Sequence, residues 1–449
     1  MRALVIGAIG FVIAIATGSA NAQTIERISV SSDGTEADGD SFAHLYDAVS
    51  ADGRYVVFES DATNLVPSDG NGFRDVFLRD RALGTTIRVS EAWGGGDAWG
   101  ESRYPSISED GRWVAFSSDA PNLVIDDTNG FQDVFVFDRQ TGLLSRVSLG
   151  WGGEADGDSR TPSLSGAGRH IAFRSGATNM VPGTVVKIYV RDLVTGVNVA
   201  ASVTSDGQPE DGGSWYPHIS SDGRYVKFIS NSTNLVPFDN NGVNDAFMRD
   251  LDLGMTLMVG VNFNGEAGNS NSGGFGICGD GRFAGIFSNA SDLLPPGEDT
   301  NGFQDAFVRD LELGVTERVS LSSSGEQGNA NSGPATLDGS GRYAAFLSDA
   351  SNLVDDDGNG ATDIFGRDRA AGMTTLLTIT EAGVQADGNC TSPTLSADGR
   401  FVVFNSTATN LVPGDTNGFQ DVFVGHGPAT ALADGFEAGD TSRWSETVP

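Results

Sequence analysis

The sequence has little cysteine, little histidine and few basic residues. Its 449 residues include two cysteines and four histidines, and 27 lysines and arginines stand against 60 aspartates and glutamates. Two cysteines cannot build a disulfide framework, and Cys278 and Cys390 fall in different repeats, so we expect both thiols to be free. The formal net charge of −33 excludes nucleic acid and anionic membranes as favourable partners, because their phosphates are negative.

The sequence also lacks the common signatures of a catalytic site. The histidines, His44, His170, His218 and His426, show no zinc-ligand spacing, and no Gly-x-Ser-x-Gly elbow occurs. The many carboxylates leave a paired-acid glycosidase open, but most of them belong to a repeat, and a repeat describes a single asymmetric site poorly. The sequence therefore favours a protein that is not an enzyme.

A long apolar run occurs only at the N-terminus. "MRALVIGAIGFVIAIATGSANA" joins a basic start, an apolar stretch and an Ala-x-Ala site that ends at Ala22. This pattern is typical of a secretory signal peptide, so we assign residues 1–22 to one. We expect a periplasmic or secreted bacterial protein with no transmembrane segment after cleavage.

Residues 23–426 are organised by a sequence repeat. A Gly-Arg pair recurs every 55 to 60 residues, at Gly53, Gly111, Gly168, Gly223, Gly281, Gly341 and Gly399. Each unit has four short runs with the period-2 alternation of strands, which in the second unit are residues 104–108, 112–118, 133–137 and 144–150. Seven such units predict an all-β protein, a seven-bladed β-propeller with four antiparallel strands per blade.

The two ends of the repeat region complement each other. "TIERISV" at residues 24–30 matches the fourth strand of another unit, "VTERVSL" at residues 315–321, while the seventh unit stops after its third strand. We expect the N-terminal strand to complete the last blade and close the ring. Residues 427–449 lie outside the repeats and are expected to form a flexible C-terminal tail.

The turn "SADGRFVVF" at residues 396–404, followed by a "DVFV" strand, resembles the TolB-like propeller repeats of bacterial envelope proteins. The resemblance covers essentially the whole mature chain and implies a propeller, a fold that serves both as a scaffold for partners and as a domain of larger enzymes. This chain lacks the separate N-terminal domain of TolB and carries a long acidic loop in each unit, so a role in the Tol system does not carry over.

Six of the seven units carry the loop Asp-x-Asn-Gly-x-x-Asp between the second and third strands. Its side-chain oxygens and sharp turn resemble the Asp-x-Asx-Gly core of EF-hand calcium loops. We predict calcium sites at these positions: Asp69, Asn71, Asp75, Asp127, Asn129, Asp133, Asp239, Asn241, Asp245, Asp299, Asn301, Asp305, Asp357, Asn359, Asp363, Asp415, Asn417 and Asp421.

A second interpretation of these loops stays open. Asn-Gly is a preferred turn pair, and the last aspartate can act as a hydrogen-bonded cap. The third unit loses all three positions together and has Lys187 in place of the last aspartate, which favours a ligand set. Asn64 and its equivalents recur even in that unit, as Asn179, and this marks them as structural braces.

In a propeller the acidic loops share one face with the fourth-to-first connections, so we expect a protein or polysaccharide partner on this long-loop face of a monomer. Departures from the repeat mark the axial opening as a second candidate site. Tyr46, Tyr104, Trp215, Tyr216 and His218 could stack on a sugar or a peptide there, or they could pack as core. The alternative function is an extracellular polysaccharide lyase or hydrolase in the central funnel, which a convergence of His218, Tyr216 and Asp47 would favour.

Overall fold

The computed structural model describes residues 24–44, 47–380 and 382–437. The expected signal peptide, Tyr46 and residues 438–449 of the expected tail lie outside this range. Within it, no helix has the length and apolar character needed to cross a membrane.

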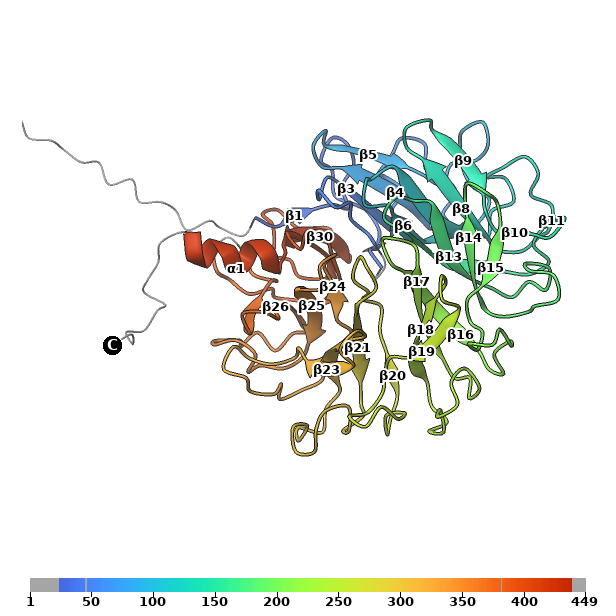
Figure 1. Ribbon diagram of the computed structural model, residues 1–449. Helices are drawn as coiled ribbons and strands as arrows, with labels where there is room; N and C mark the ends of the chain where they lie inside the picture. Colours follow the sequence, from blue (N-terminus) through green and yellow to red (C-terminus); the bar gives the residue numbers. More distant parts are fainter. Residues whose placement is uncertain (1–23, 45–46, 381, 438–449) are drawn as a thin grey trace, which may run out of the picture.

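The described strands form seven four-stranded antiparallel sheets, which are the blades of a propeller (Figure 1). The strands of blades 1 to 3 are β2 (Ser41–Phe42), β3 (Tyr55–Ser60), β4 (Asp75–Asp80) and β5 (Thr85–Arg88); β6 (Ser102–Ile107), β7 (Trp113–Ser118), β8 (Asp133–Asp138) and β9 (Leu143–Arg146); and β12 (Ser159–Leu164), β13 (His170–Ser175), β14 (Ile188–Asp192) and β15 (Asn198–Ala200). The strands of blades 4 to 6 are β16 (Ser214–Ile219), β17 (Tyr225–Ser230), β18 (Asp245–Asp250) and β19 (Met255–Met258); β20 (Ser272–Gly273), β21 (Phe283–Ser288), β22 (Asp305–Asp310) and β23 (Val315–Arg318); and β24 (Thr336–Leu337), β25 (Tyr343–Ser348), β26 (Asp363–Asp368) and β27 (Met373–Leu376). Between blades 2 and 3, β10 (Leu149–Gly150) and β11 (Gly153–Glu154) form a small hairpin. The all-β, seven-bladed prediction is confirmed.

The N-terminal strand closes the ring as the sequence predicted. Blade 7 contains β28 (Cys390–Leu395), β29 (Phe401–Ser406) and β30 (Asp421–His426), and its outer strand is β1 (Glu26–Arg27). Figure 1 shows β1 beside β30, and the register pairs Glu26 with Val424 and Arg27 with Phe423. The last blade therefore has its outer edge covered by the first strand of the chain.

Six of the seven blades have the same aromatic pair between their second and third strands. In blade 1 the rings of Phe58 and Phe77 are both fully buried, with their centroids 5.6 Å apart. Equivalent ring pairs recur in five more blades, and Ile286 takes the first position in blade 5. Because successive side chains of a strand point to opposite faces, the period-2 pattern of the sequence places a pair of large apolar side chains at this position in every sheet.

The repeated Gly-Arg pair has two structural causes. Gly111 has φ +67°, which only glycine adopts without cost, and a Cβ there would lie 2.4 Å from the Tyr55 ring of the preceding blade. The following Arg112 forms an ion pair with Asp138 at 2.8 Å. The glycine therefore makes a tight turn that packs against the neighbouring blade, and the arginine links this turn to the third strand of its own blade by an ion pair.

The short-turn end of the axis is narrowed by backbone hydrogen bonds between blades. One residue from each first turn approaches the axis, and the amide of Glu109, for example, donates to the Gly166 carbonyl at 3.0 Å. Similar bonds join blade 1 to blade 2, and so on round to blade 7. The residues at this position are Ala51, Glu109, Gly166, Ser221, Gly279, Gly339 and Ala397. All except Glu109 are small, so the backbones can approach one another at this end of the axis.

Helix α1 (Pro428–Glu437) forms the first part of the segment that the sequence assigns to a tail. It packs against β25, β26 and β27 of blade 6 and against β30. Gly366 allows the helix to pack closely, because a Cβ at Gly366 would lie 2.8 Å from the Pro428 ring. The other blades have a larger apolar side chain at that position.

Both cysteine thiols are free and buried, as predicted. Burial raises the pKa of Cys278 and of Cys390 to about 12, so neither is a reactive thiolate at neutral pH.

Candidate functional site

The side-chain amide of the asparagine in each acidic loop forms hydrogen bonds within the loop and to a neighbouring connection. In blade 2 the Asn129 amide donates to Asp133 at 2.9 Å and to the Ala155 carbonyl at 3.2 Å, and its oxygen accepts from the Phe131 amide at 2.9 Å. The same three bonds recur in all six acidic loops. Because Ala155 belongs to the following fourth-to-first connection, the asparagine also ties two loops of the long-loop face together.

The last aspartate of each loop is buried and caps the end of the fourth strand. Asp75 is 0% exposed and accepts the Ser90 hydroxyl at 2.5 Å. Blades 2, 5, 6 and 7 repeat this bond with Ser148, Ser320, Thr378 and Ser29. Blade 4 has Gly260 at the hydroxyl position, and the hydroxyl comes instead from Ser272 of blade 5, 2.9 Å from Asp245.

In four of the six loops an arginine lies between the first and the last aspartate. The Arg88 guanidinium is 3.1 Å from Asp69 and 3.3 Å from Asp75, and only 2% of its side chain is exposed. Arg146, Arg318 and Arg27 do the same in blades 2, 5 and 7. These arginines occupy the same register on the outer strand, each opposite the central phenylalanine of the third strand. The four loops therefore already contain a buried cation supplied by the chain.

Blades 4 and 6 have the carboxylates without the arginine. The register puts Met258 and Leu376 at the arginine position. In blade 4, Asp239 Oδ1 is buried and finds no hydrogen-bond partner among the described residues. Burial raises the pKa of Asp245 to about 6 and also raises the pKa of Asp357 in blade 6. Among the described residues, no basic side chain forms an ion pair with the carboxylates of these two loops.

Blade 3 replaces its missing aspartate with a carboxylate from another loop. Glu210, in the connection to blade 4, accepts the Ser202 hydroxyl at 2.8 Å and the Lys187 amide at 2.7 Å. Ser202 is the counterpart of Ser90, so Glu210 accepts the hydrogen bond that Asp75 accepts in blade 1. The loss of all three loop positions in this unit, which favoured a ligand set in the sequence, thus has a second explanation.

The predicted braces lie where the sequence put them. The Asn122 amide donates to the Asp97 carbonyl at 3.0 Å, and its oxygen accepts from the Trp99 amide at 2.9 Å. The same pair of bonds is made by Asn64, Asn179, Asn234, Asn352 and Asn410. In these six blades the second-to-third loop is therefore fixed to the connection that enters the blade.

Two of the residues singled out in the sequence, His218 and Asp47, line a small cavity at the axis. His218 Nε2 lies 3.3 Å from both carboxylate oxygens of Asp47, which joins blade 4 to blade 1 across the axis. Tyr216 is 43% exposed, with its ring edge-on to Phe275 at 5.5 Å. The Trp215 ring lies beside Gly213, at the start of β16.

A second polar cluster lies beside blade 1, and it was not predicted as a group. Glu59 is 1% exposed and contacts His44 at 2.9 Å, Arg74 at 2.8 Å and the Tyr104 amide at 2.7 Å. Tyr104 has φ +57° at a bulge in β6, and in blade 7 Asn405 binds the equivalent backbone of the next blade, at Ala43. One role of Glu59 is therefore to satisfy that strained backbone. A carboxylate at a position that is apolar or neutral in most other blades was the signal in the sequence.

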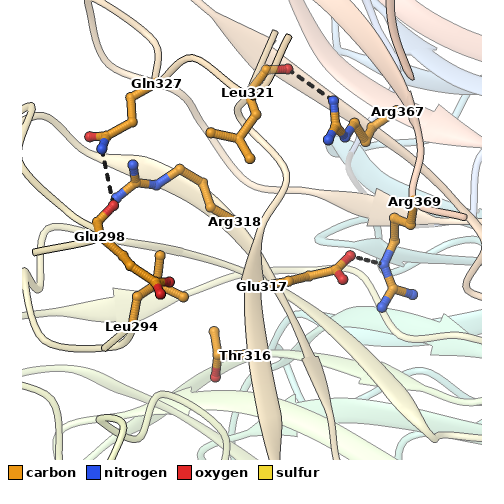
Figure 2. A pocket seen from close by; sticks show the side chains of 10 residues that line it. Leu294, Glu298, Thr316, Glu317, Arg318, Leu321, Gln327, Arg367 and Arg369 are labelled. Atoms are coloured by element: carbon orange, nitrogen blue, oxygen red, sulfur yellow. Dashed lines mark hydrogen bonds and ion pairs between the residues drawn. The ribbon is translucent and has the colours of Figure 1, made fainter. Parts of the chain in front are cut away.

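A groove opens on the outer side between blades 5 and 6. It has a volume of about 440 Å³ and is lined by Arg318, Arg367, Arg369, Glu298 and Glu317 among others. Figure 2 shows Arg369 directed at Glu317 and Arg367 directed at the carbonyl of Leu321. Arg318 and Arg369 are therefore already paired with carboxylates, while Arg367 is hydrogen-bonded to backbone carbonyls and to the Thr374 hydroxyl.

Among the described residues, no group of three or more His, Cys, Asp or Glu side chains is placed to hold a metal ion. An ion in an acidic loop would therefore depend on two carboxylates together with carbonyl and water oxygens, which calcium accepts as ligands.

No protein-family model matches the chain, and no curated protein matches it. Similar solved structures include an oligogalacturonate lyase in complex with manganese, at 13% identity and a TM-score of 0.54, covering 92% of this chain and 98% of that one. An oligogalacturonate lyase from Vibrio parahaemolyticus has 13% identity and a TM-score of 0.52, covering 90% and 97%. TolB from Acinetobacter baumannii has 15% identity and a TM-score of 0.37, covering 84% and 81%.

These likenesses concern the fold, because identities this low assign no activity. The strand pairing establishes a seven-bladed β-propeller.

Proposed function

We propose that the chain is an exported, monomeric propeller scaffold that binds a protein or polysaccharide partner on its long-loop face. The observation that carries the proposal is the bracing of that face. Asn122 and Asn129, with their equivalents, tie five of the six acidic loops to the connections on either side, and Asp292 takes the position of Asn122 in blade 5. A preorganised surface loses little conformational entropy on binding, whereas the opposite face offers only short turns.

We further propose that calcium stabilises this face in blades 4 and 6. An arginine in the other four loops would repel a divalent ion, since its guanidinium lies about where the ion would sit. In blade 4, the unpartnered Oδ1 of Asp239 and the buried Asp245 are hard oxygen donors of the kind calcium prefers. Asp357 and Asp363 are their counterparts in blade 6. This narrows the calcium sites predicted from the sequence from six loops to two.

The test is thermal unfolding of the mature protein in excess EDTA and in millimolar calcium, with bound metal counted. A ligand that binds only the folded state raises the melting temperature, so we expect an upward shift and two ions per chain. The variant Asp239→Asn/Asp357→Asn should lose the shift. The matched variant Asp127→Asn/Asp299→Asn, in two arginine-containing blades, should keep it.

Two outcomes would count against calcium. The absence of any shift or bound metal would make all six loops hydrogen-bonded turns. A shift that survives in Asp239→Asn/Asp357→Asn would place the ions elsewhere.

The second candidate function is a polysaccharide lyase or hydrolase in the funnel. The His218–Asp47 contact favours it, because a carboxylate beside an imidazole can orient it as a proton acceptor. The fold is also that of oligogalacturonate lyases. The net charge of −33 weakens the case for a polyuronate substrate, since like charges repel.

Incubation with polygalacturonate and with neutral polysaccharides tests this candidate. Ultraviolet absorbance would report the unsaturated product of a lyase, and new reducing ends would report a hydrolase. Activity that disappears in His218→Ala and Asp47→Asn, but not in Asp206→Ala on the loop face, would establish an enzyme. Absence of product from every substrate would count against an enzyme and would favour the scaffold function.

A further inference from the structure

Three tryptophans stand exposed around blade 2 on the long-loop face. Trp93 is 61% exposed, Trp99 71% and Trp151 76%. Ile125 and Phe131, on the acidic loop between them, are 66% and 41% exposed. We call these five residues the blade 2 aromatic patch. Large apolar groups gathered on one exposed surface mark an interaction site more often than chance exposure does.

The backbone beneath the patch is fixed. The Trp93 amide donates to the Asn122 carbonyl at 2.8 Å, and the Trp99 amide donates to the Asn122 side chain at 2.9 Å. The Trp151 amide donates to the Asn179 carbonyl at 2.6 Å. The backbone amides of Trp93 and Trp99 are thus both hydrogen-bonded to Asn122, and that of Trp151 is hydrogen-bonded to the equivalent asparagine of blade 3. Their exposure is a feature of ordered loops.

The fold does not require tryptophan at these positions. In the connections that enter blades 1, 4 and 6, the residue equivalent to Trp93 and Trp151 is a serine, and its hydroxyl bonds the edge strand of the next blade. The pairs are Ser32 with Thr86, Ser205 with Thr256 and Ser323 with Thr374. The indoles of blade 2 make no such bond, so stability does not explain them.

The charge around the patch is negative. Glu91, Asp119, Asp126 and Asp156 are exposed on the same loops. The nearby arginines are each paired with a carboxylate, namely Arg88, Arg103, Arg146 and Arg160. The face of an indole attracts a cation more strongly than other aromatic faces do, and the carboxylates add a Coulomb attraction of the same sign.

From this combination we propose that the blade 2 aromatic patch binds a basic polypeptide segment, with lysine or arginine side chains over the indoles and paired to the surrounding carboxylates. The inference rests on the proposed function, since it names the part of the long-loop face that meets the partner and the chemistry of that partner. A neutral glycan could stack on the indoles but would gain nothing from the net charge, and a polyuronate would be repelled.

The test uses the mature protein and a dye-labelled peptide that alternates arginine and glycine, with binding followed by fluorescence anisotropy. We expect salt-sensitive binding that weakens by about tenfold or more in Trp93→Ala/Trp99→Ala/Trp151→Ala, because several cation–π contacts are lost together. The matched variant Phe263→Ala/Phe303→Ala removes exposed aromatic groups from the blade 5 side of the same face. It should bind like the wild type. A peptide with citrulline in place of arginine should bind at least tenfold more weakly.

The triple variant keeps every carboxylate, so unspecific attraction to an acidic protein would be unchanged in it. Equal affinity of the triple variant and the wild type would overturn the inference. It would also be overturned by absence of binding, or by equal binding of the citrulline peptide or of a soluble neutral glucan.

Hydrogen exchange of the complex distinguishes this inference from the proposed function, which is binding of a partner anywhere on the long-loop face. Protection of residues 91–101, 123–132 and 149–156 supports both. Protection confined to the loops of other blades overturns the inference but keeps a partner on the long-loop face. Protection of the short turns on the opposite face overturns both.

Discussion

The Glu210 carboxylate accepts a hydrogen bond from the Ser202 hydroxyl at 2.8 Å, in the blade whose own loop has Lys187 where the others have aspartate. A carboxylate is therefore present at the end of the fourth strand in every blade, although it comes from two different loops. This constancy shows that the buried carboxylate has a hydrogen-bonding role apart from any role in binding metal.

Replacing Glu210 with alanine should destabilise the propeller. The change removes the acceptor of the Ser202 hydroxyl and of the Lys187 amide, and unsatisfied buried donors cost about 1–3 kcal/mol. Urea unfolding should report a loss of that size. Asp206→Ala, an exposed carboxylate on the same loop, should change the stability by less than about 0.5 kcal/mol. If Glu210→Ala were as stable as the wild type, Glu210 would not be the replacement for Asp75.

Arginine and calcium should be interchangeable between blades. Met258→Arg places a guanidinium between Asp239 and Asp245, as Arg146 lies between its two aspartates. We expect this variant to melt at a higher temperature than the wild type in EDTA and to respond less to calcium. An unchanged calcium response would show that blade 4 binds no ion.

The reverse exchange should have the opposite effect. Arg146→Met leaves Asp127 and Asp133 without their cation, which we expect to cost about 3–5 kcal/mol in EDTA because a buried ion pair loses one partner. Calcium should restore part of this loss. Differential scanning calorimetry with and without calcium measures both effects, and recovery absent at saturating calcium would contradict the exchange.

The stability in EDTA should depend on pH through Asp245. Burial raises the pKa of Asp245 from 3.8 to about 6 in the folded state. The stabilising contribution of its protonated form is complete below pH 3.8 and is lost as the pH rises through about 6. The loss corresponds to about 3 kcal/mol at about 1.4 kcal/mol per pH unit.

The difference between the wild type and Asp245→Asn isolates this group, because the pKa of Asp69 is also raised to about 6. Unfolding free energies measured from pH 4 to pH 7 should converge at the acid end once the constant effect of the substitution is subtracted. Asp138→Asn is the control, since its pKa is lowered to about 2 by the Arg112 hydrogen bond. A constant difference between wild type and Asp245→Asn across this range would contradict the raised pKa.

Lys227 should produce a slope at alkaline pH. Its side chain is fully buried between blades 4 and 5 with its amine on the carbonyls of Gly276 and Gly285, and burial lowers its pKa to about 7. Between pH 7 and about 10.5 the unfolded chain binds a proton that the folded chain does not, so stability rises with pH by up to about 1.4 kcal/mol per unit. Lys227→Met should remove this slope. If the unfolding free energy had the same pH slope in the wild type and in Lys227→Met, the pKa of the amine would not be lowered by burial.

The architecture follows from local patterns in the sequence. The spacing of Gly111 and its equivalents, the alternation of the strands and the match between residues 24–30 and a fourth strand were enough to predict seven blades and their closure. These features are local: a glycine at positive φ and an apolar residue at every second position act within a few neighbours along the chain.

Only the tertiary structure decided what fills the acidic loops. Arg146 reaches Asp127 across two strands, Glu210 reaches Ser202 from the connection to the next blade, and His218 meets Asp47 across the axis. Nothing in the spacing of these residues indicates that they meet, because strand register and the packing of blades bring them together. A buried carboxylate must be satisfied by some cation or donor, but which partner satisfies it depends on positions that only the folded chain defines.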